Sequence, residues 1–295
     1  MHFGFKYKGR HTSEFGALMR SKSRPILPQK RQRYLDLPNK DGSINYANVN
    51  DYGRAMYDNR TITVTLLVRA DNVTQLENRV SRVAEWLIGS GTLVFDDMPD
   101  TAWMAAVDNA VDFAPEREGR KALITVDFVC QPFSHALFSV GAGVYLGLPI
   151  ALGTQIELGA TDNDFRLTGT SGSVTVNNVG TAWARPAVTV TRTDGGAVGT
   201  WSMSGARADG STATLTVTKF DGIPNVGWTV DLDKYTLKRL SADHFPDTYG
   251  GALLGEFFEL APGENTIYFT FSESAEHRVK FVYEPQYIYS SGGGE

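Results

Sequence analysis

Short segments in which apolar and polar residues alternate recur along much of the chain, and they limit its fold more than any other feature. In "RTITVTLLV" at 60–68, Ile62, Val64 and Leu66 fall on one side, with threonines opposite. Successive side chains of an extended strand point to opposite faces, so a period of two predicts a strand. The second half of the chain repeats the pattern in "SVTVNN", "PAVTVTR", "TATLTVTKF", "GWTVDL", "NTIYFTFS" and "HRVKFVYE". The sequence therefore predicts a mainly β protein.

One segment breaks the period of two. In "DNVTQLENRVSRVAEWLIGSG" the apolar residues follow at steps of three and four, which places them on one face of a helix: Val73, Leu76, Val80, Val83 and Leu87. Asn72 suits the N-cap, with Gln75 three residues later, and Gly89 can end the helix. We expect a helix over about 73–88 that packs across a sheet, with Trp86 at the junction.

Glycine and turn signals divide the chain into two domains. Periodicity is lost in "QPFSHALFSVGAGVYLGLPIALGT", which gathers Gly141, Gly143, Gly147 and Pro149. We predict a first domain over 1–135, a β-sandwich with one packed α-helix, and a Gly-rich linker over 136–152. A second β-sandwich should occupy 153–289, because its short strands have no helix between them, and 290–295 should be a flexible tail.

Composition excludes several classes of protein. The 295 residues carry a net charge of −5, and nonspecific binding to nucleic acid needs a basic face. Cys130 is the single cysteine, so neither an intramolecular disulfide nor a cysteine-based metal site can form. No apolar run is long enough for a membrane span or a secretory signal, so we expect a soluble protein made in the cytoplasm.

The motifs of known enzymes are missing. The five histidines are scattered without metal-ligand spacing, and neither a GxSxG elbow nor a glycine-rich phosphate loop occurs. Asp96, Asp97 and Asp100 cluster in "FDDMPD", where a glycosidase pair or a cation site is conceivable, but acids in a loop after a strand are usually solvated. We therefore predict no catalysis, no metal and no cofactor.

The tryptophans of the second half leave one binding function open. Aromatic faces stack on sugar rings, and Trp201 in "GTWSMSG" follows a turn, where it could be exposed. Trp201 is therefore the candidate sugar-stacking residue of an alternative function, a carbohydrate-binding β-sandwich protein. Burial of the tryptophan in a sandwich core is the competing interpretation.

Several segments together resemble the distal tail proteins of long, flexible-tailed (siphovirus) bacteriophages. They occur in the order "HTSEFGALMRSKSRPILPQKRQRYLDLPNKDGSINY", "YDNRTITVTLLV", "AEWL", "GTLVFDDMPDTAWMAAV" and "VTVNNVGTAWARPAVTV". The resemblance covers most of the chain, and its most specific parts are the run from "SEFG" to "NRTITV" and the segment from Asn178 to Pro186.

The resemblance implies a fold and a role. The first domain is expected to be tail-tube-like and the second galectin-like. Six first domains would close into a ring around a DNA channel in the virion tail tip. That homo-hexamer would sit between a tail-tube protein and a tail-hub protein and could carry receptor-binding proteins, with DNA only in transit.

The basic stretch "RPILPQKRQRYLDLPNKDGSINY" at 24–46 is interpreted in the light of that ring. Prolines favour an extended backbone, and Asp41-Gly42 signals a turn. We expect an arm whose Lys30, Arg31 and Arg33 meet acidic residues of a neighbouring subunit, with Asp96, Asp97 and Asp100 as candidate partners. A solvated loop and direct DNA contact remain as alternatives.

Overall fold

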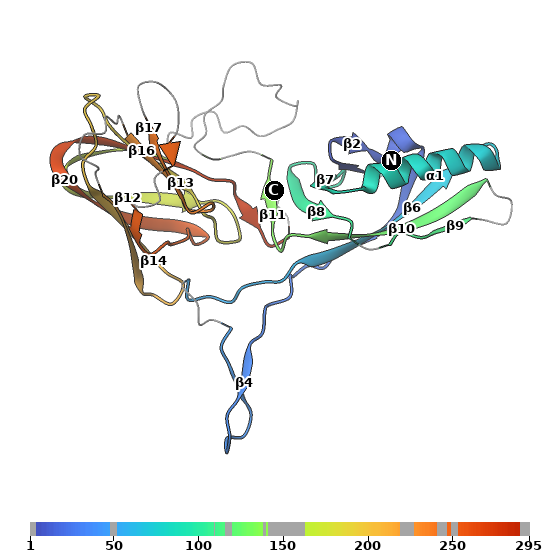
Figure 1. The fold of residues 1–295 in the computed structure, drawn as a ribbon, viewed down its shortest axis with the longest axis horizontal. Coiled ribbons are helices and arrows are strands. Elements are labelled where there is room, and N and C mark those ends of the chain that lie inside the picture. Colours follow the sequence, from blue (N-terminus) through green and yellow to red (C-terminus); the bar gives the residue numbers. More distant parts are fainter. Residues whose placement is uncertain are drawn as a thin grey trace. The chain divides into compact units, whose positions relative to one another are not determined.

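We analysed a computed structural model of the chain (Figure 1). It describes residues 4–47, 52–108, 110–115, 120–137, 140, 163–218, 227–240, 247–248 and 253–289. The predicted tail at 290–295 and most of the predicted linker at 136–152 lie outside these residues. Within them the protein is mainly β with one α-helix, as the alternating segments predict.

The chain forms two compact units, and each is built from separate stretches of sequence. The first unit combines residues 1–31, 56–137 and 287–295, and the second combines 32–55 and 138–286. The longest stretch of the first unit runs to residue 137, and the predicted domain bounds stay a prediction. The sequence did not predict that residues 32–55 group with the second unit, or that the C-terminal residues return to the first.

The first unit holds its strands in one sheet with the path β2-β1-β7-β8-β10-β6-β3. β9 pairs with β10, and β11 pairs with β8 and β21. The strands are β1 (Phe5–Tyr7), β2 (Arg10–His11), β3 (Ala17–Ser23), β6 (Arg60–Arg69), β7 (Ser90–Phe95), β8 (Thr101–Ala106), β9 (Phe113–Pro115), β10 (Lys121–Cys130), β11 (Ser134–Ala136) and β21 (Gln286–Tyr287), with a 3-10 turn η1 (Thr12–Phe15).

The helix α1 (Val73–Leu87) covers one face of this sheet, and its prediction from the sequence is confirmed (Figure 1). Asn72 caps it, since its side-chain oxygen accepts a hydrogen bond from the Gln75 amide at 2.9 Å. Trp86 is 3% exposed, stacks on Phe15 at 4.5 Å between ring centroids, and donates to the Tyr7 carbonyl at 2.9 Å. The predicted junction of helix and sheet is therefore the aromatic core of the unit.

A buried arginine fastens the C-terminal segment to the first unit. Arg60 is 3% exposed, and its guanidinium donates to the carbonyls of Pro25 at 3.0 Å, Ile288 at 2.6 Å and Pro132. Ser134 donates to the carbonyl of Tyr289 at 3.2 Å. The carbonyls of Ile288 and Tyr289 therefore accept hydrogen bonds from side chains that lie far away in the sequence.

The second unit arranges its strands in the order β18-β17-β16-β13-β20-β14-β15-β19, with β12 also paired to β20. Its strands are β12 (Asp164–Asn178), β13 (Ala187–Arg192), β14 (Trp201–Ala206), β15 (Thr212–Val217), β16 (Gly227–Asp231), β17 (Thr236–Leu240), β18 (Asp247–Thr248), β19 (Leu253–Gly255) and β20 (Gly263–Val282). One half of β20 pairs with β14 and the other with β13, so a single long strand joins both parts of the sheet around one core.

A separate two-stranded hairpin also belongs to the second unit. It consists of β4 (Tyr34–Asp36) and β5 (Ser43–Asn45), and no further strand pairs with either in the part of the chain that is described. Gly42 has a φ of 75°, a left-handed value that glycine adopts without strain, so the turn signal at Asp41-Gly42 is confirmed. Figure 1 shows the hairpin as a narrow ribbon with no strand beside it.

Candidate functional site

The described residues hold no group of three or more histidine, cysteine or carboxylate side chains placed to bind a metal ion. Likewise, no helix in the described ranges is both long and apolar enough to span a membrane. The remaining candidates among the described residues are a groove beside α1, exposed charged side chains and exposed apolar side chains.

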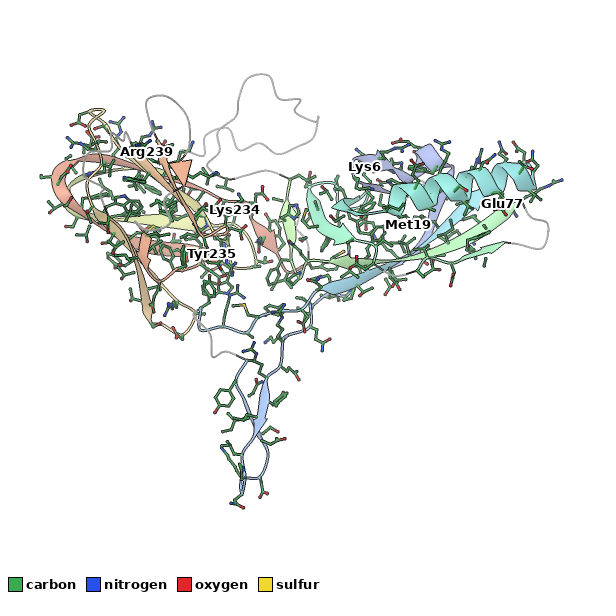
Figure 2. The ribbon with its side chains drawn as sticks, in the orientation of Figure 1. Lys6, Met19, Glu77, Lys234, Tyr235 and Arg239 are labelled. Carbon is green, nitrogen blue, oxygen red and sulfur yellow. The ribbon has the colours of Figure 1, made fainter. Side chains whose placement is uncertain are left out.

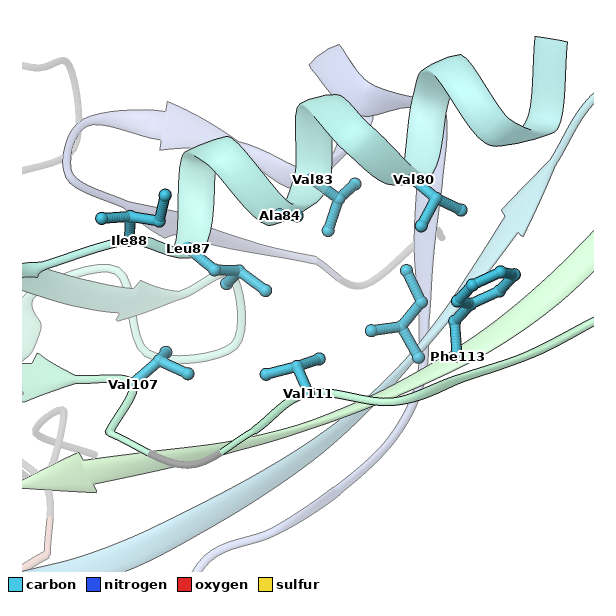
Figure 3. A pocket seen from close by; sticks show the side chains of 9 residues that line it. Val80, Val83, Ala84, Leu87, Ile88, Val107, Val111 and Phe113 are labelled. Carbon is cyan, nitrogen blue, oxygen red and sulfur yellow. The ribbon is translucent and has the colours of Figure 1, made fainter. Parts of the chain in front are cut away.

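One groove opens beside α1, and the side chains that line it are apolar (Figure 3). It has a volume of about 270 Å³ and is lined by Val80, Val83, Ala84, Leu87, Ile88, Val107, Val111, Phe113 and Ile124. Sites for small ligands usually span ~300–1,000 Å³ and include a few polar groups that fix orientation. This groove is slightly smaller and offers no polar side chain, so we assign it neither a cofactor nor a substrate.

The three basic candidates lie at the start of the hairpin, and all are exposed. Arg31 forms an ion pair with Asp58 of its own chain at 2.7 Å, and its amide donates to the Met56 carbonyl. Lys30 forms a backbone bridge with Tyr57, and the Arg33 carbonyl accepts from the Tyr46 amide at 2.7 Å. The backbone here is fixed, while the side chains of Lys30 and Arg33 extend into solvent.

Two of the three acidic candidates are already engaged within their own unit. Asp96 accepts from the Gly4 amide at 2.7 Å and lies 3.1 Å from His11 Nε2. Asp97 pairs with Lys22. Such contacts compete with any partner from another subunit, so Asp100 is the most available of the three. The structure does not bring these acids together with the basic candidates, and their role at an interface stays a prediction.

Of the two interpretations of Trp201, the structure supports burial in the core and not exposure. Trp201 is 1% exposed and stacks on Phe269 in the core of the second unit, at 6.2 Å between ring centroids. It belongs to the inward row of β14 together with Met203, which is fully buried. A side chain enclosed in this way offers no face to a sugar ring.

The hairpin is amphipathic. Leu35 lies directly opposite Ile44, and the alternation along each strand adds Leu37 and Tyr46 to the same face. Leu35 is 48% exposed, Leu37 36% and Tyr46 37%. The other face carries Tyr34, which is 57% exposed, and Asp36, which accepts a hydrogen bond from Ser43 at 2.5 Å. The candidate functional surface is therefore the apolar face of the hairpin: Leu35, Leu37, Ile44 and Tyr46.

The stem of the hairpin is held on the second unit by a buried carboxylate. Glu259 has a side chain only 2% exposed, and it accepts from Arg54 Nε at 2.6 Å and Nη2 at 2.8 Å. Arg185 Nε donates to the same carboxylate at 2.9 Å. Charge-assisted bidentate pairs of this kind are the strongest hydrogen bonds in proteins, and they fix geometry as well as position.

Aromatic rings surround this carboxylate. The guanidinium carbon of Arg185 lies 4.9 Å from the centroid of the Tyr52 ring, and the hydroxyls of Tyr52 and Tyr235 are 2.6 Å apart. Burial and this hydrogen bond raise the pKa of Tyr52 well above its ordinary value, so its hydroxyl keeps its proton. Burial lowers the pKa of Arg185, but Glu259 and Tyr52 outweigh that effect and raise it overall.

Tyr235 is held in a strained conformation within this cluster, and it is labelled in Figure 2. Its φ is +54°, a left-handed value that costs a bulky residue about 1–3 kcal/mol. The ring packs edge-on against Phe257 at 4.8 Å between centroids, and the preceding turn is fixed by Asp231, which accepts from the Lys234 amide at 3.0 Å. The strain places the Tyr235 hydroxyl where Tyr52 can reach it.

Sequence reasoning missed both the apolar face and its anchor. The alternation of Leu35 and Leu37 is visible in the sequence, and with Ile44 and Tyr46 after the turn it could have indicated the amphipathic hairpin. The anchor gives no such signal, because Arg54, Arg185 and Glu259 are separated by 131 and 74 positions.

Comparisons with known proteins agree with this architecture. Residues 17–130 match the family model for the phage tail protein RIFT-related domain. The crystal structure of the SPP1 Dit (gp 19.1) protein, described as a paradigm of the hub adsorption apparatus in phages that infect Gram-positive bacteria, is similar over 97% of this chain and 99% of that chain. Its TM-score is 0.67 and its sequence identity 15%.

A second solved structure is less similar. A chain of the phage P2 baseplate, in its activated conformation with Ca, aligns over 98% of this chain and 100% of that chain, with a TM-score of 0.44 and 7% identity. No curated protein sequence matches the chain. Residues 17–130 are thus similar to a family of phage tail proteins, and 97% of the chain shares its fold with the SPP1 Dit protein.

Proposed function

We propose, on the premise that residues 17–130 belong to the phage tail protein RIFT-related domain family, that this chain is a structural protein of a siphophage tail tip or baseplate. The observation that carries the proposal is the match of nearly the whole chain to one distal tail protein fold, with both units included. No catalytic role is part of it.

We also propose how the protein assembles. Six copies would form a ring around a channel for DNA, between a tail-tube protein and a tail-hub protein, with receptor-binding proteins as possible further partners. Support comes from the uncovered apolar face of the hairpin, because a two-stranded hairpin is only marginally stable in water and gains from a partner. When two different surfaces of identical subunits meet, and the rotation from one subunit to the next adds up to a full turn, the subunits form a closed ring.

The alternative of a carbohydrate-binding protein has lost the observation that favoured it. It depended on an exposed Trp201, and this side chain is buried in the core.

The mass of the purified protein in solution tests the assembly. Each chain has a mass of 32.3 kDa, so six copies give roughly 194 kDa. Light scattering over a range of concentrations should show this species, and negative-stain images should show rings with a central hole. A second sample contains the same protein together with a tail-tube and a tail-hub protein, because a neighbouring protein can act as the template on which the ring forms. A monomer in both samples would contradict the proposed ring.

A further inference from the structure

We infer that residues 178–186 form a clasp that holds both ends at which the chain leaves the second unit for the first, so that the two ends loosen together. The chain passes to the first unit after residue 55 and again after residue 286. We name these two ends of the second unit the first exit (54–55) and the second exit (Gln286). The proposed function gives the clasp no role, and the inference does not depend on the ring.

The second exit is held by the backbone of the clasp. The Ala182 amide donates a hydrogen bond to the Gln286 carbonyl at 3.0 Å. Gly180 makes this approach possible, because a Cβ at that position would collide with the Gln286 carbonyl oxygen. The Gly180 amide is itself fixed, since it donates to Asn178 Oδ1 at 2.9 Å. A side chain at position 180 would therefore force Gln286 away from the clasp.

The first exit is held by a side chain of the same clasp, through a shared carboxylate. Arg185 Nε donates to the buried Glu259 at 2.9 Å. The same carboxylate accepts from Arg54 Nε at 2.6 Å and from Arg54 Nη2 at 2.8 Å. Arg54 is the penultimate residue of its stretch of the second unit. Glu259 therefore ties the end of that stretch to the clasp with charge-assisted hydrogen bonds.

Buried hydrogen bonds within the second unit connect these two contacts. Asn178 is 1% exposed, and its Nδ2 donates to the Ala182 carbonyl at 3.0 Å and to the Leu260 carbonyl at 3.1 Å. Ala184 and Leu260 exchange backbone hydrogen bonds of 3.0 and 2.8 Å, and Leu260 directly follows Glu259 in the chain. The residue that holds the second exit and the residue that holds the first are thus joined through one polar network.

Such a network makes the two exits interdependent. When one contact opens, buried donors and acceptors of the clasp lose their partners, which costs more free energy than the same loss at an exposed site. The remaining contact is weaker in that state, so the open form of one exit favours the open form of the other. Coupling of this kind is reciprocal, and a displacement of either exit is transmitted to the other.

Gly180→Ala in the full-length protein tests the coupling, because it disturbs the second exit and can be measured at the first. The measurement is the rate at which trypsin cleaves after Arg54, whose side chain is 13% exposed while it is bound to Glu259. We expect this rate to rise about tenfold, since the first exit opens more often. Amide exchange in β14 and β15 should stay slow, which shows that the second unit remains folded.

Val179→Ala is the matched control, since Val179 lies in the clasp beside Gly180 and is 48% exposed. This variant should be cleaved after Arg54 at the rate of the wild type. Hydrogen exchange of the Ala182 amide reports the second exit in the same samples. Faster exchange at Ala182 with unchanged cleavage after Arg54 would mean that the exits are held separately, and it would overturn the shared clasp. No change at either position in Gly180→Ala would overturn it as well.

The reverse experiment covers the case in which Gly180→Ala does not fold. Glu259→Gln weakens the first exit, and we expect exchange of the Ala182 amide at the second exit to become about tenfold faster. Glu256→Gln is its control, because Glu256 pairs with Arg207 while its side chain is 59% exposed. Equal exchange at Ala182 in Glu259→Gln and the wild type would refute the coupling. Both experiments can be made on monomer or ring, so a failure of the proposed ring leaves the clasp to be judged separately.

Discussion

His277 is an uncommon residue for the place it occupies. It lies in the inward row of β20, is 1% exposed, and stacks on Phe271 at 3.7 Å between ring centroids. Burial, and then the nearby Arg192, lower its pKa, while Glu273 and Asp194 oppose the change. The neutral imidazole is therefore the form that the folded protein accommodates.

This lowered pKa predicts a loss of stability in mild acid. Unfolded His277 binds a proton below about pH 6.5, but the folded form resists, so the free energy of unfolding falls as the pH drops from 6.5 towards the folded pKa. His277→Phe should remove this decline and keep the stacking. The measurement is the unfolding midpoint of both proteins at pH 7 and pH 5.

Two carboxylates with lowered pKa values, Asp164 and Asp194, do not interfere with that comparison. Hydrogen bonds from Arg278 and Arg192 lower the pKa of Asp164 and Asp194 below the ordinary 3.8, so their contributions are lost only in stronger acid. An equal decline in the wild type and His277→Phe between pH 7 and pH 5 would show that His277 is not responsible.

At the scale of single elements, α1 shows what local sequence can specify. Its apolar stripe and the cap at Asn72 are encoded within a short window, and the structure places the helix at Val73–Leu87. The strands β6 and β10 follow their alternating segments for the same reason. The position of Trp201 was harder to predict, because alternation identifies a buried row only when the facing sheet is known.

The N-cap provides a prediction for this element. Asn72→Ala removes the acceptor for the Gln75 amide and should lower the free energy of unfolding of the first unit by about 1 kcal/mol. Asn72→Asp keeps an acceptor and should stay close to the wild type. Urea unfolding followed by tryptophan fluorescence measures both, and equal stability of all three proteins would show that the cap contributes nothing.

At the scale of the whole molecule, the chain passes between the two units four times, after residues 31, 55, 137 and 286. Contacts between segments this far apart leave no local signal in the sequence, which is why the membership of 32–55 and 287–295 was not predicted. The same holds for the anchor, where Glu259 meets Arg54 and Arg185, one from each of the two stretches that make up the second unit. The fold class could be predicted from pattern, but the way in which the units share the chain could not.

The return of the C-terminus predicts an effect of truncation on the first unit. Ending the chain after Pro285 removes the Ile288 carbonyl that Arg60 binds and the Tyr289 ring that lies 4.4 Å from the Arg24 guanidinium. We expect the free energy of unfolding of the first unit to fall by about 3 kcal/mol. A chain that ends after Tyr289 keeps these contacts and serves as the control. Identical urea midpoints for the two truncations would contradict the prediction.

The two units are built from alternating stretches of one chain, so translation completes them in a fixed order. Residues 56–137 are made before residues 138–286, yet the Ile288 carbonyl that accepts a hydrogen bond from Arg60 is made only after them. At about 5–20 residues per second, roughly 8–30 s separate Leu137 from Tyr287. The unit that begins first is therefore completed after the other, so a chain interrupted just after residue 286 would hold an unfinished first unit and a second unit whose residues are all present.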